Sequence, residues 1–504
     1  MTTEPKFTNL NNTYATPQVT FPAADRAGFG ELRVASMTAE LQVSFPYNIN
    51  SRQIKTRTNN GASTSHANGL ATVSSGTNTN SFGSLETQEA AHYDPGQGLV
   101  ARFTALFTQG VAGSNQLAGL GSVDDGYFFC YAGTCFGLLV RRGGSQHGET
   151  LTISAGAGTS GGTITITLDG DTQEVELALN DTATEVAQKI AATDFSDVGQ
   201  GWDAYQEGAK VHFISYDAAL MTGSFTLTDT DTTGAAGTFA EVLAGVAPTE
   251  EIVAQADWNM DTMDGNGPSR MTIDPTKCNV YQIVAQWLGF GQITFYIEAE
   301  NSGRMVPVHA VRYTNANTVP SVANLNLPMT SEVLNTTSTT SVSVSVACLM
   351  AFTEGEEQEL GPLTSFENLK SVSGGTETVL LAVFNKPFYQ GKENRTRVKL
   401  ALINFSTDGT KSVEIKGWLN PNLGGSPSFS DFDTNTSVLS SDTAATTVSG
   451  GTLVGSAVMA KVDGIFPPVA TLDIRLNPGD LIAFTALSSS NSEVGVGCIW
   501  RERF

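Results

Sequence analysis

One acidic segment of the chain has the residue types and spacing of a cation-binding loop. Asp257, Asp261, Asp264 and Asn266 stand close together among glycines, and Ca²⁺ prefers oxygen ligands of this kind. Met263, however, occupies a position at which an EF-hand-type loop needs an oxygen ligand, and no Glu follows at the required distance. The segment is therefore either a calcium site or a plain turn, and the pattern favours the turn.

The other residues that commonly carry chemistry do not form a recognisable catalytic or metal-binding pattern. The five histidines stand singly, outside the spacings typical of zinc sites, and no nucleophile elbow, phosphate-binding loop or dinucleotide-binding loop is present. A pair of carboxylates for glycoside cleavage depends on a distance in space that the sequence does not give. We therefore predict no catalytic residues, no cofactor and no enzymatic activity. The histidines are His66, His92, His147, His212 and His309.

The five cysteines indicate buried thiols rather than a disulfide framework. They are few, odd in number and lie mostly in apolar strand patterns, as expected of a protein made in a reducing compartment. Cys130 and Cys135, on either side of a predicted hairpin turn, are the one plausible disulfide pair. The remaining three are Cys278, Cys348 and Cys498.

The charge balance excludes one class of partner. Fifty acidic against 27 basic residues give a net charge of −23, which repels phosphate backbones and anionic lipid. No long apolar run and no basic, apolar leader occur, so we expect neither a membrane span nor a standard export signal.

The elements that must position any site are β-strands. The blocks Asp124–Arg142 and Asp274–Tyr313 are dense in aromatic and β-branched residues with sharp Gly turns, which predicts hairpins of a large sheet. Leu99–Thr108 alternates apolar and polar residues, as a half-buried strand does. Ser341–Phe352 alternates Ser and Val and predicts another strand, whereas the polar stretch from Thr58 to Ser84 offers no strong strand.

Residues 148–250 differ in character from both blocks. They hold 16 acidic and two basic residues, a net charge of −14, and include the one confident helix, Thr182–Ala192. A capping box of Thr182 and Glu185 marks its start. The segment is predicted to be a small α+β module that projects into solvent.

The chain is thus predicted to be mostly β, with two β-sandwich domains of concanavalin-like or jelly-roll-like type and a small α+β domain inserted in the first. The C-terminal part has seven or more short strands and a type II turn at Asn477-Pro478-Gly479-Asp480. The predicted units are an N-terminal arm (1–30), a discontinuous sandwich (31–147 and 251–353), the acidic module (148–250), a linker around Glu354–Gly361, and a C-terminal jelly-roll-like sandwich (362–504).

Several long phrases resemble a recurrent family of structural proteins of tailed bacteriophages and other large DNA viruses. The most specific are the WLGFG hairpin and the DPTK turn, supported by DPGQGLVARFTALFT, DDGYFFCYAGTCFGLLVRRGG, PNLGGSPSF and the terminal IWRERF. The inserted segment GTITITLDGDTQEVELALNDTATEVAQKIA is similar to a module of phage tail and adhesion proteins. The resemblance implies a fibre-, spike- or tail-associated virion component and supplies no catalytic residues.

We therefore expect a virion structural protein that is made in the host cytoplasm. It would assemble with itself, as a trimer or larger ring, and with neighbouring virion proteins, with host attachment as an added role. The alternative is a carbohydrate-binding receptor module of lectin type, for which exposed aromatics such as Tyr296, Trp418 and Phe290 could stack on a host surface glycan. A polysaccharide depolymerase ranks last, because the acidic surface suits anionic chains poorly.

Overall fold

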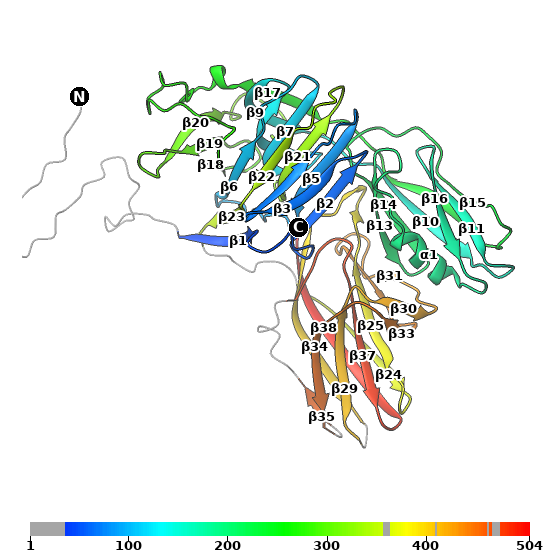
Figure 1. Ribbon diagram of the computed structural model, residues 1–504. Helices are drawn as coiled ribbons and strands as arrows, with labels where there is room; N and C mark the ends of the chain where they lie inside the picture. Colours follow the sequence, from blue (N-terminus) through cyan, green and yellow to red (C-terminus); the bar gives the residue numbers. More distant parts are fainter. Residues whose placement is uncertain (1–35, 356–362, 409–410, 461–462, 466–473) are drawn as a thin grey trace, which may run out of the picture.

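The computed structural model describes residues 36–355, 363–408, 411–460, 463–465 and 474–504. The described chain is nearly all β-strand, which confirms the predicted fold class. Figure 1 shows three bodies, which we call the N-terminal sandwich (top), the inserted module (right) and the C-terminal sandwich (bottom). The predicted arm (1–30) lies outside the described residues, as does most of the predicted linker, Glu354–Gly361.

Two large antiparallel sheets form the N-terminal sandwich. The first runs β20 (Met305–Val311), β19 (Ile293–Glu298), β18 (Asn279–Ala285), β6 (Leu99–Phe107), β22 (Ser343–Val346), β4 (Leu70–Ser74), β3 (Ser63–Ala67), with β23 (Cys348–Glu354) pairing β6 and β1 (Met37–Ser44) pairing β23. The second runs β17 (Thr249–Ala254), β9 (Cys135–Arg142), β8 (Gly126–Ala132), β7 (Ser114–Gly121), β21 (Met329–Asn335), β5 (Ser81–Thr87), β2 (Ile54–Asn59).

An aromatic core joins these two sheets. Phe103, Tyr281 and Phe295 come from the first sheet and Phe129 from the second, and all four are buried. The rings of Phe129 and Tyr281 lie 4.5 Å apart and those of Phe129 and Phe295 meet edge to face at 5.5 Å. Inward positions alternate along each strand, so the predicted hairpin blocks bury one face each in a common core.

Two parts of the sandwich differ from the sequence prediction. The polar stretch from Thr58 to Ser84 forms β3, β4 and the start of β5, because Ala71 and Val73 alternate inward between serines and threonines that face outward. The predicted strand Ser341–Phe352 is split into β22 and β23. At the break, the side-chain oxygen of Thr104 accepts hydrogen bonds from the backbone N–H groups of Ala347 and Cys348.

The inserted module leaves the N-terminal sandwich after β9 and returns in β17, which pairs with β9. Its helix α1 (Ala183–Ala192) starts at Thr182 with the predicted capping box, since Thr182 and Glu185 exchange hydrogen bonds. Two small sheets surround the helix. They are β13 (Trp202–Glu207), β14 (Lys210–Ser215), β10 (Gly148–Ala155), β16 (Ala236–Leu243), and β12 (Asp171–Leu177), β11 (Gly162–Leu168), β15 (Thr226–Asp229).

The C-terminal sandwich packs two antiparallel sheets around Trp500, which is buried and lies 4.6 Å from the ring of Phe432. The predicted turn at Asn477–Asp480 is present, with Gly479 at φ 89° and a hydrogen bond from the Asp480 N–H to the Asn477 carbonyl. The sheets are β24 (Leu363–Val372), β38 (Ser492–Arg503), β28 (Arg397–Thr407), β35 (Asp463–Ile465) with β36 (Arg475–Leu476), and β31 (Ser430–Asp431), β32 (Leu439–Asp442), β25 (Thr378–Asn385), β37 (Leu481–Ser488), β29 (Val413–Leu419), β34 (Thr452–Met459).

A few short elements complete the described chain. They are two small two-stranded sheets, β26 (Phe388–Tyr389) with β27 (Lys392–Glu393) and β30 (Asn422–Gly425) with β33 (Ala445–Ser449), and the 3-10 helix η1 (Gln255–Asp257). Among the described residues no helix is both long and apolar enough to cross a membrane.

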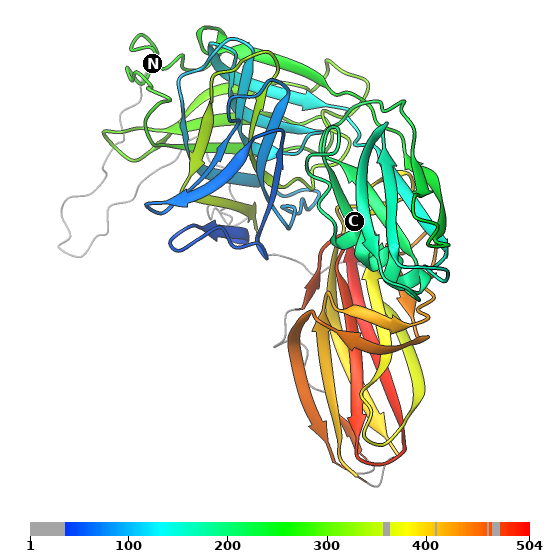
Figure 2. The same ribbon diagram turned by 45° about the vertical axis from the view of Figure 1, so that its right-hand side comes forward.

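The acidic module does not simply project into solvent, as its charge had suggested. Figure 2 shows it lying against both sandwiches. Its Asp203 is paired with Arg57 of the N-terminal sandwich, and its Glu207 accepts a hydrogen bond from Ser440 of the C-terminal sandwich. Much of the module's charge remains exposed, but Asp203 has a cationic partner and Glu207 a hydroxyl partner on the neighbouring sandwiches.

Candidate functional site

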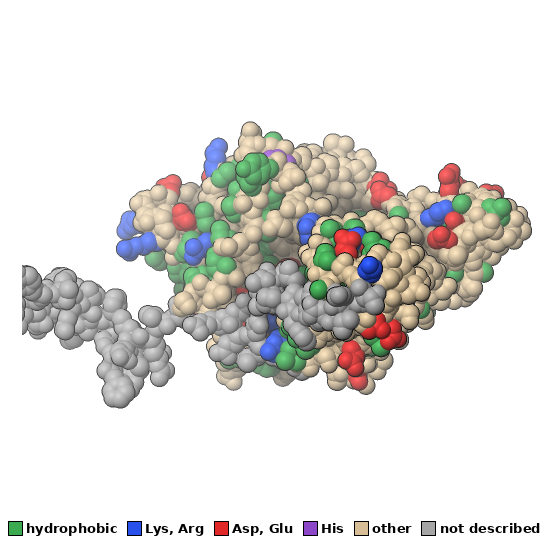
Figure 3. Space-filling model, turned by 90° about the horizontal axis from the view of Figure 1, so that it is seen from below, with side chains coloured by type: hydrophobic (Ala, Val, Ile, Leu, Met, Phe, Trp, Pro, Cys, Tyr) green, Lys and Arg blue, Asp and Glu red, His purple; other side chains and the backbone are tan. Residues whose placement is uncertain are grey.

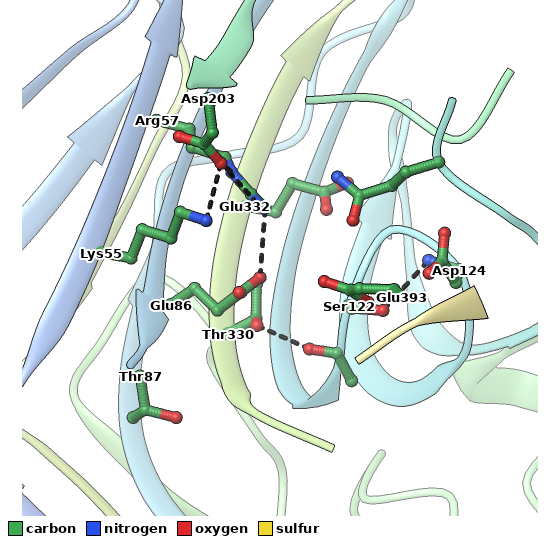
Figure 4. A network of polar contacts seen from close by, with 12 residues as sticks. Lys55, Arg57, Glu86, Thr87, Ser122, Asp124, Asp203, Thr330, Glu332 and Glu393 are labelled. Atoms are coloured by element: carbon green, nitrogen blue, oxygen red, sulfur yellow. Dashed lines mark hydrogen bonds and ion pairs between the residues drawn. The ribbon is translucent and has the colours of Figure 1, made fainter. Parts of the chain in front are cut away.

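Charged side chains that the chain keeps far apart in sequence meet where the three bodies join. We call this set the junction network, and Figure 4 shows most of it. Strand alternation places Lys55 and Arg57 on the outer face of β2, and the register places Glu86 of β5 opposite Lys55. The network consists of Lys55, Arg57, Glu86, Ser122, Asp124, Asp203, Glu393 and Arg395.

The inserted module contributes one carboxylate that receives two cations. Asp203 Oδ2 lies 2.6 Å from Lys55 Nζ and 2.8 Å from Arg57 Nη2, and Lys55 also donates to the hydroxyl of Tyr205 at 2.6 Å. Burial would raise the pKa of Asp203, yet the charges of Lys55 and Arg57 hold it below its usual value. The Arg57 side chain is 2% exposed, so this contact is screened little by solvent.

At the contact with the C-terminal sandwich, the N-terminal sandwich supplies the carboxylate and its partner supplies the cation. Arg395 lies 3.0 Å from Asp124 and 2.9 Å from Glu393, and it also donates to Ser122. Two further arginines of the C-terminal sandwich extend this contact. Arg397 pairs with the fully buried Glu40 at 2.8 Å, and Arg503 reaches Asp94 at 2.9 Å.

Two carboxyls beside Arg395 titrate differently. Burial, together with the negative charge of Glu393, raises the pKa of Asp124 to about 7, although Arg395 acts in the opposite direction. Burial also disfavours the charge of Glu393, but Arg395 and Arg57 hold its pKa below the usual value. Asp124 therefore takes up a proton near neutral pH while Glu393 stays ionised.

A set of polar hollows surrounds the network. One of about 70 Å³ lies among Lys55, Tyr205 and Arg395. A larger one of about 500 Å³ shares Lys55 and Tyr205 with it and extends between α1 and the C-terminal sandwich. We call this larger hollow the junction cleft. Its remaining polar lining is mostly amide: Gln88, Gln188, Gln206, Asn420, Asn422 and Asn477, together with the carboxylates of Asp203 and Asp480.

The lining of the junction cleft combines fixed and uncommitted groups. Asn420 donates to Asp480 at 2.8 Å, and Gln206 donates to two backbone carbonyls, so both are held in place. Within the described part of the chain, the side chains of Gln188 and Asn422 have no hydrogen-bond partner. An amide carries both donors and an acceptor, and a sugar hydroxyl is also both. The cleft therefore offers groups that match a polyhydroxylated ligand.

The predicted calcium loop lies elsewhere, in the N-terminal sandwich. The carboxylate of Asp261 is buried and accepts from the backbone N–H groups of Met263 and Ser269, and Asp264 accepts from Thr262 and from the N–H of Asn266. Asp257 is exposed in η1. These oxygens stabilise turns, and within the described residues the three aspartates do not form a group close enough to share an ion. Calcium binding at this loop stays the less favoured of the two interpretations.

Other residues singled out from the sequence also lie outside the cleft. Cys130 and Cys135 are free thiols, and burial raises the pKa of Cys130. Trp418 is half-buried and donates to Glu377, and Phe290 is 39% exposed beside Tyr313.

Sequence reasoning missed the junction network. Its available signal was the alternation of charged residues in Lys55-Thr56-Arg57 and Arg395-Thr396-Arg397, which marks an outer strand face but names no partner.

Comparison with known proteins adds little. No protein-family model matches the chain, and no curated protein matches it. Solved structures that it resembles include peanut lectin (10% identity, 62% of this chain and 97% of that one, TM-score 0.24). Others are the VIP36 exoplasmic/lumenal domain (9%, 65% and 93%, TM-score 0.23) and a protein of unknown function from Shewanella oneidensis MR-1 (10%, 69% and 100%, TM-score 0.25). TM-scores this low do not establish a shared fold, and neither the fold described above nor the function proposed below depends on them.

Proposed function

We propose that this protein is a carbohydrate-binding protein without catalytic activity, and that the junction cleft holds the sugar. The observation that carries the proposal is the amide-rich lining of a cleft of about 500 Å³. Ligand sites commonly occur at domain interfaces and orient a ligand with a few fixed polar groups. Here Asn420 and Gln206 are fixed, while Gln188 and Asn422 are free to bind hydroxyls.

The absence of catalysis is part of the proposal. The carboxylates that line the cleft or its neighbours are engaged: Asp203 with Lys55 and Arg57, Asp480 with Asn420, and Glu89 with Arg475. A glycosidase needs one carboxyl that protonates the leaving oxygen and a second that acts as base or nucleophile. Release of reducing ends from any bound glycan by the purified protein would contradict this part of the proposal.

A glycan array probed with the full chain tests the binding. We expect a restricted set of glycans to bind, and we expect the double substitution Gln188→Ala/Asn422→Ala to weaken binding at least tenfold without changing the thermal midpoint. Both residues lack side-chain partners in the described structure, so their removal leaves the fold intact. Asn301→Ala, on the exposed loop between β19 and β20, is the matched control. Unchanged binding in the double variant would place the sugar elsewhere or exclude it.

A second candidate function is assembly into a virion, the role that the sequence resemblance implies. The supporting observation is apolar surface on one edge strand of each sheet of the C-terminal sandwich: Leu363 and Leu369 of β24 are 57% and 62% exposed, and Val458 of β34 is 66% exposed. Figure 3, which views the molecule from below, shows hydrophobic side chains interspersed with acidic ones. Edge strands with exposed apolar residues readily pair with another chain.

Oligomeric state tests this second candidate. Assembly through these edges predicts a trimer or larger ring by light scattering at high concentration, and Leu369→Lys should dissociate it because a charge on the strand edge opposes pairing. Thr447→Lys, at an exposed position of β33, which pairs with neither β24 nor β34, is the control. A protein that stays monomeric at all concentrations would exclude homo-oligomeric assembly and, with it, the support for a place in a virion.

A further inference from the structure

Three side chains capable of binding a metal meet at the point where the inserted module joins the rest of the chain. His147 and Glu149 are two residues apart at the start of β10, so their side chains lie on the same face. The antiparallel register places Glu241 of β16 directly opposite Glu149. β10 is the first strand of the module and β16 is the last of its four-stranded sheet, so the three residues connect the two ends of the module.

The distances suit a shared ion. His147 Nε2 lies 3.2 Å from Glu149 Oε1, and His147 Nδ1 lies 4.0 Å from Glu241 Oε2. One ligand atom from each of the three residues can be chosen so that all lie within 4.8 Å of one another. Ligand atoms about 2.0–2.2 Å from a common zinc ion stand between 3 and 4 Å apart. Glu149 and Glu241 contact different nitrogens of the ring, and an ion binds only one nitrogen, so one of the two carboxylates has to swing towards that nitrogen.

The buried members of this group have polar atoms without partners. The His147 side chain is 1% exposed and that of Glu149 is 6% exposed, yet within the described residues His147 Nδ1 and Glu149 Oε2 have no hydrogen-bond partner. Buried polar atoms are nearly always satisfied, because leaving one unpaired costs about 1–3 kcal/mol. The two side chains contact each other through His147 Nε2 and Glu149 Oε1 at 3.2 Å, so each keeps one buried atom that can still bind a further partner.

Neighbouring rings hold the imidazole of His147 in place, and the exposed side chain of Glu241 connects the group to solvent. The ring of His147 stacks on Phe225 at 5.1 Å with an interplanar angle of 18° and meets Trp202 edge to face at 6.1 Å. Glu241, in contrast, has a side chain that is 56% exposed. An ion can therefore arrive from solvent on Glu241 and be held inside by two ligands whose positions are already set.

We propose that His147, Glu149 and Glu241 bind a divalent transition-metal ion, with zinc as the best match. An imidazole nitrogen and two carboxylates favour zinc over calcium, which prefers oxygen ligands throughout. The two carboxylates balance the charge of the ion, and water completes the coordination. The ion ties β10 to β16 and so strengthens the base of the inserted module. The role is structural, and it does not depend on the proposed sugar binding.

Metal titration of the full chain tests the site. After treatment with EDTA and dialysis, a Cys278→Ser variant, which removes the exposed thiol, should bind one equivalent of Zn²⁺ by calorimetry, and its thermal midpoint should rise by several degrees at saturation. With Co²⁺ as the probe, the absorption spectrum should lack an intense thiolate charge-transfer band. A protein that binds no Zn²⁺ or Co²⁺ and gains no thermal stability would overturn the proposal.

A matched pair of variants separates this site from adventitious binding. Glu241→Gln removes a ligand that is largely exposed, so the fold should be retained while Zn²⁺ affinity falls at least tenfold and the metal-dependent rise in midpoint disappears. Glu176→Gln, an exposed position on β12 of the same module, should leave both unchanged. Equal loss in the two variants, or no loss in Glu241→Gln, would show that the metal binds elsewhere.

Discussion

The aromatic core of the N-terminal sandwich and the junction network are both buried, but they stabilise the protein in different ways. In the core, Phe103, Phe129 and Tyr281 remove apolar surface from water, and any apolar residue of similar size would serve nearly as well. At the junction, Arg57, Asp203 and Arg395 stabilise only when the opposite charge is present at the right distance. The core therefore makes each body stable, whereas the network specifies how the bodies join.

The largest expected effect is in the core. Phe129→Ala should lower the free energy of unfolding of the N-terminal sandwich by about 3–5 kcal/mol, because it leaves a cavity among four aromatic neighbours. Chemical denaturation followed by tryptophan fluorescence measures it. Phe290→Ala, at a ring that is 39% exposed, should cost far less. Similar costs for the two variants would mean that the core is not the main source of stability.

Breaking the junction should cost less and affect a different property. Arg57→Ala leaves Glu86 without its main partner and Asp203 with Lys55 alone, at a cost of about 3 kcal/mol. We expect the loss to appear as faster hydrogen exchange in β13 and β2 while the aromatic core stays protected. Arg142→Ala removes a more exposed ion pair with Glu251 and should change stability by less than about 1 kcal/mol. If exchange rises uniformly through the chain, the junction and the core are one cooperative unit.

The junction should also respond to pH in a way the core cannot. The pKa of Asp124 is about 7 in the folded protein, against 3.8 as its ordinary value. The folded state therefore holds the Asp124 proton more tightly than the unfolded chain does. The contribution of this proton to the free energy of unfolding is complete below about pH 4 and is lost as the pH rises through 7. Asp124→Asn mimics the neutral form. Relative to it, the wild type should lose about 4 kcal/mol between pH 4 and 8, measured by denaturation at each pH, and parallel curves would contradict the raised pKa.

The smallest predicted effect concerns a contact within one short segment. Thr182→Ala removes the side chain that caps α1 and should cost about 1 kcal/mol in the inserted module. Thermal unfolding detects it, and Thr182→Ser, which keeps the hydroxyl, should restore most of the loss. A cost equal to that of Arg57→Ala would mean that local capping matters as much as the junction does.

The aromatic core and the junction network also differ in how far the sequence could predict them. Alternation in Leu99–Thr108 and the hairpin blocks predicted core strands, and β9 (Cys135–Arg142) and β19 (Ile293–Glu298) lie within those blocks. Serine and threonine concealed β3 and β4, because these residues suit both loops and outward strand faces. The junction could not be predicted, since a charged side chain on an outer face is ordinarily solvated.

The two candidate metal-binding groups show the same limit of sequence-based prediction. Asp257, Asp261 and Asp264 were conspicuous in sequence, yet the oxygens of Asp261 and Asp264 are taken up by nearby backbone and hydroxyl groups. His147 and Glu149 appeared unremarkable because their partner Glu241 stands about 90 residues further along the chain. Spacing reports only ligands that are close in sequence, whereas strand pairing brings together ligands from any distance.

The sequence by itself determined the class of structure: strand periodicity, turn residues and the capping box are local properties, and each favours one backbone conformation whatever lies beyond it. The tertiary structure decided which charges meet. Asp203 pairs with Arg57 and Arg395 with Asp124 across about 150 and 270 residues, because sheet register and domain docking, rather than neighbouring residues, set those distances. The candidate cleft and the proposed metal site both depend on that second kind of information.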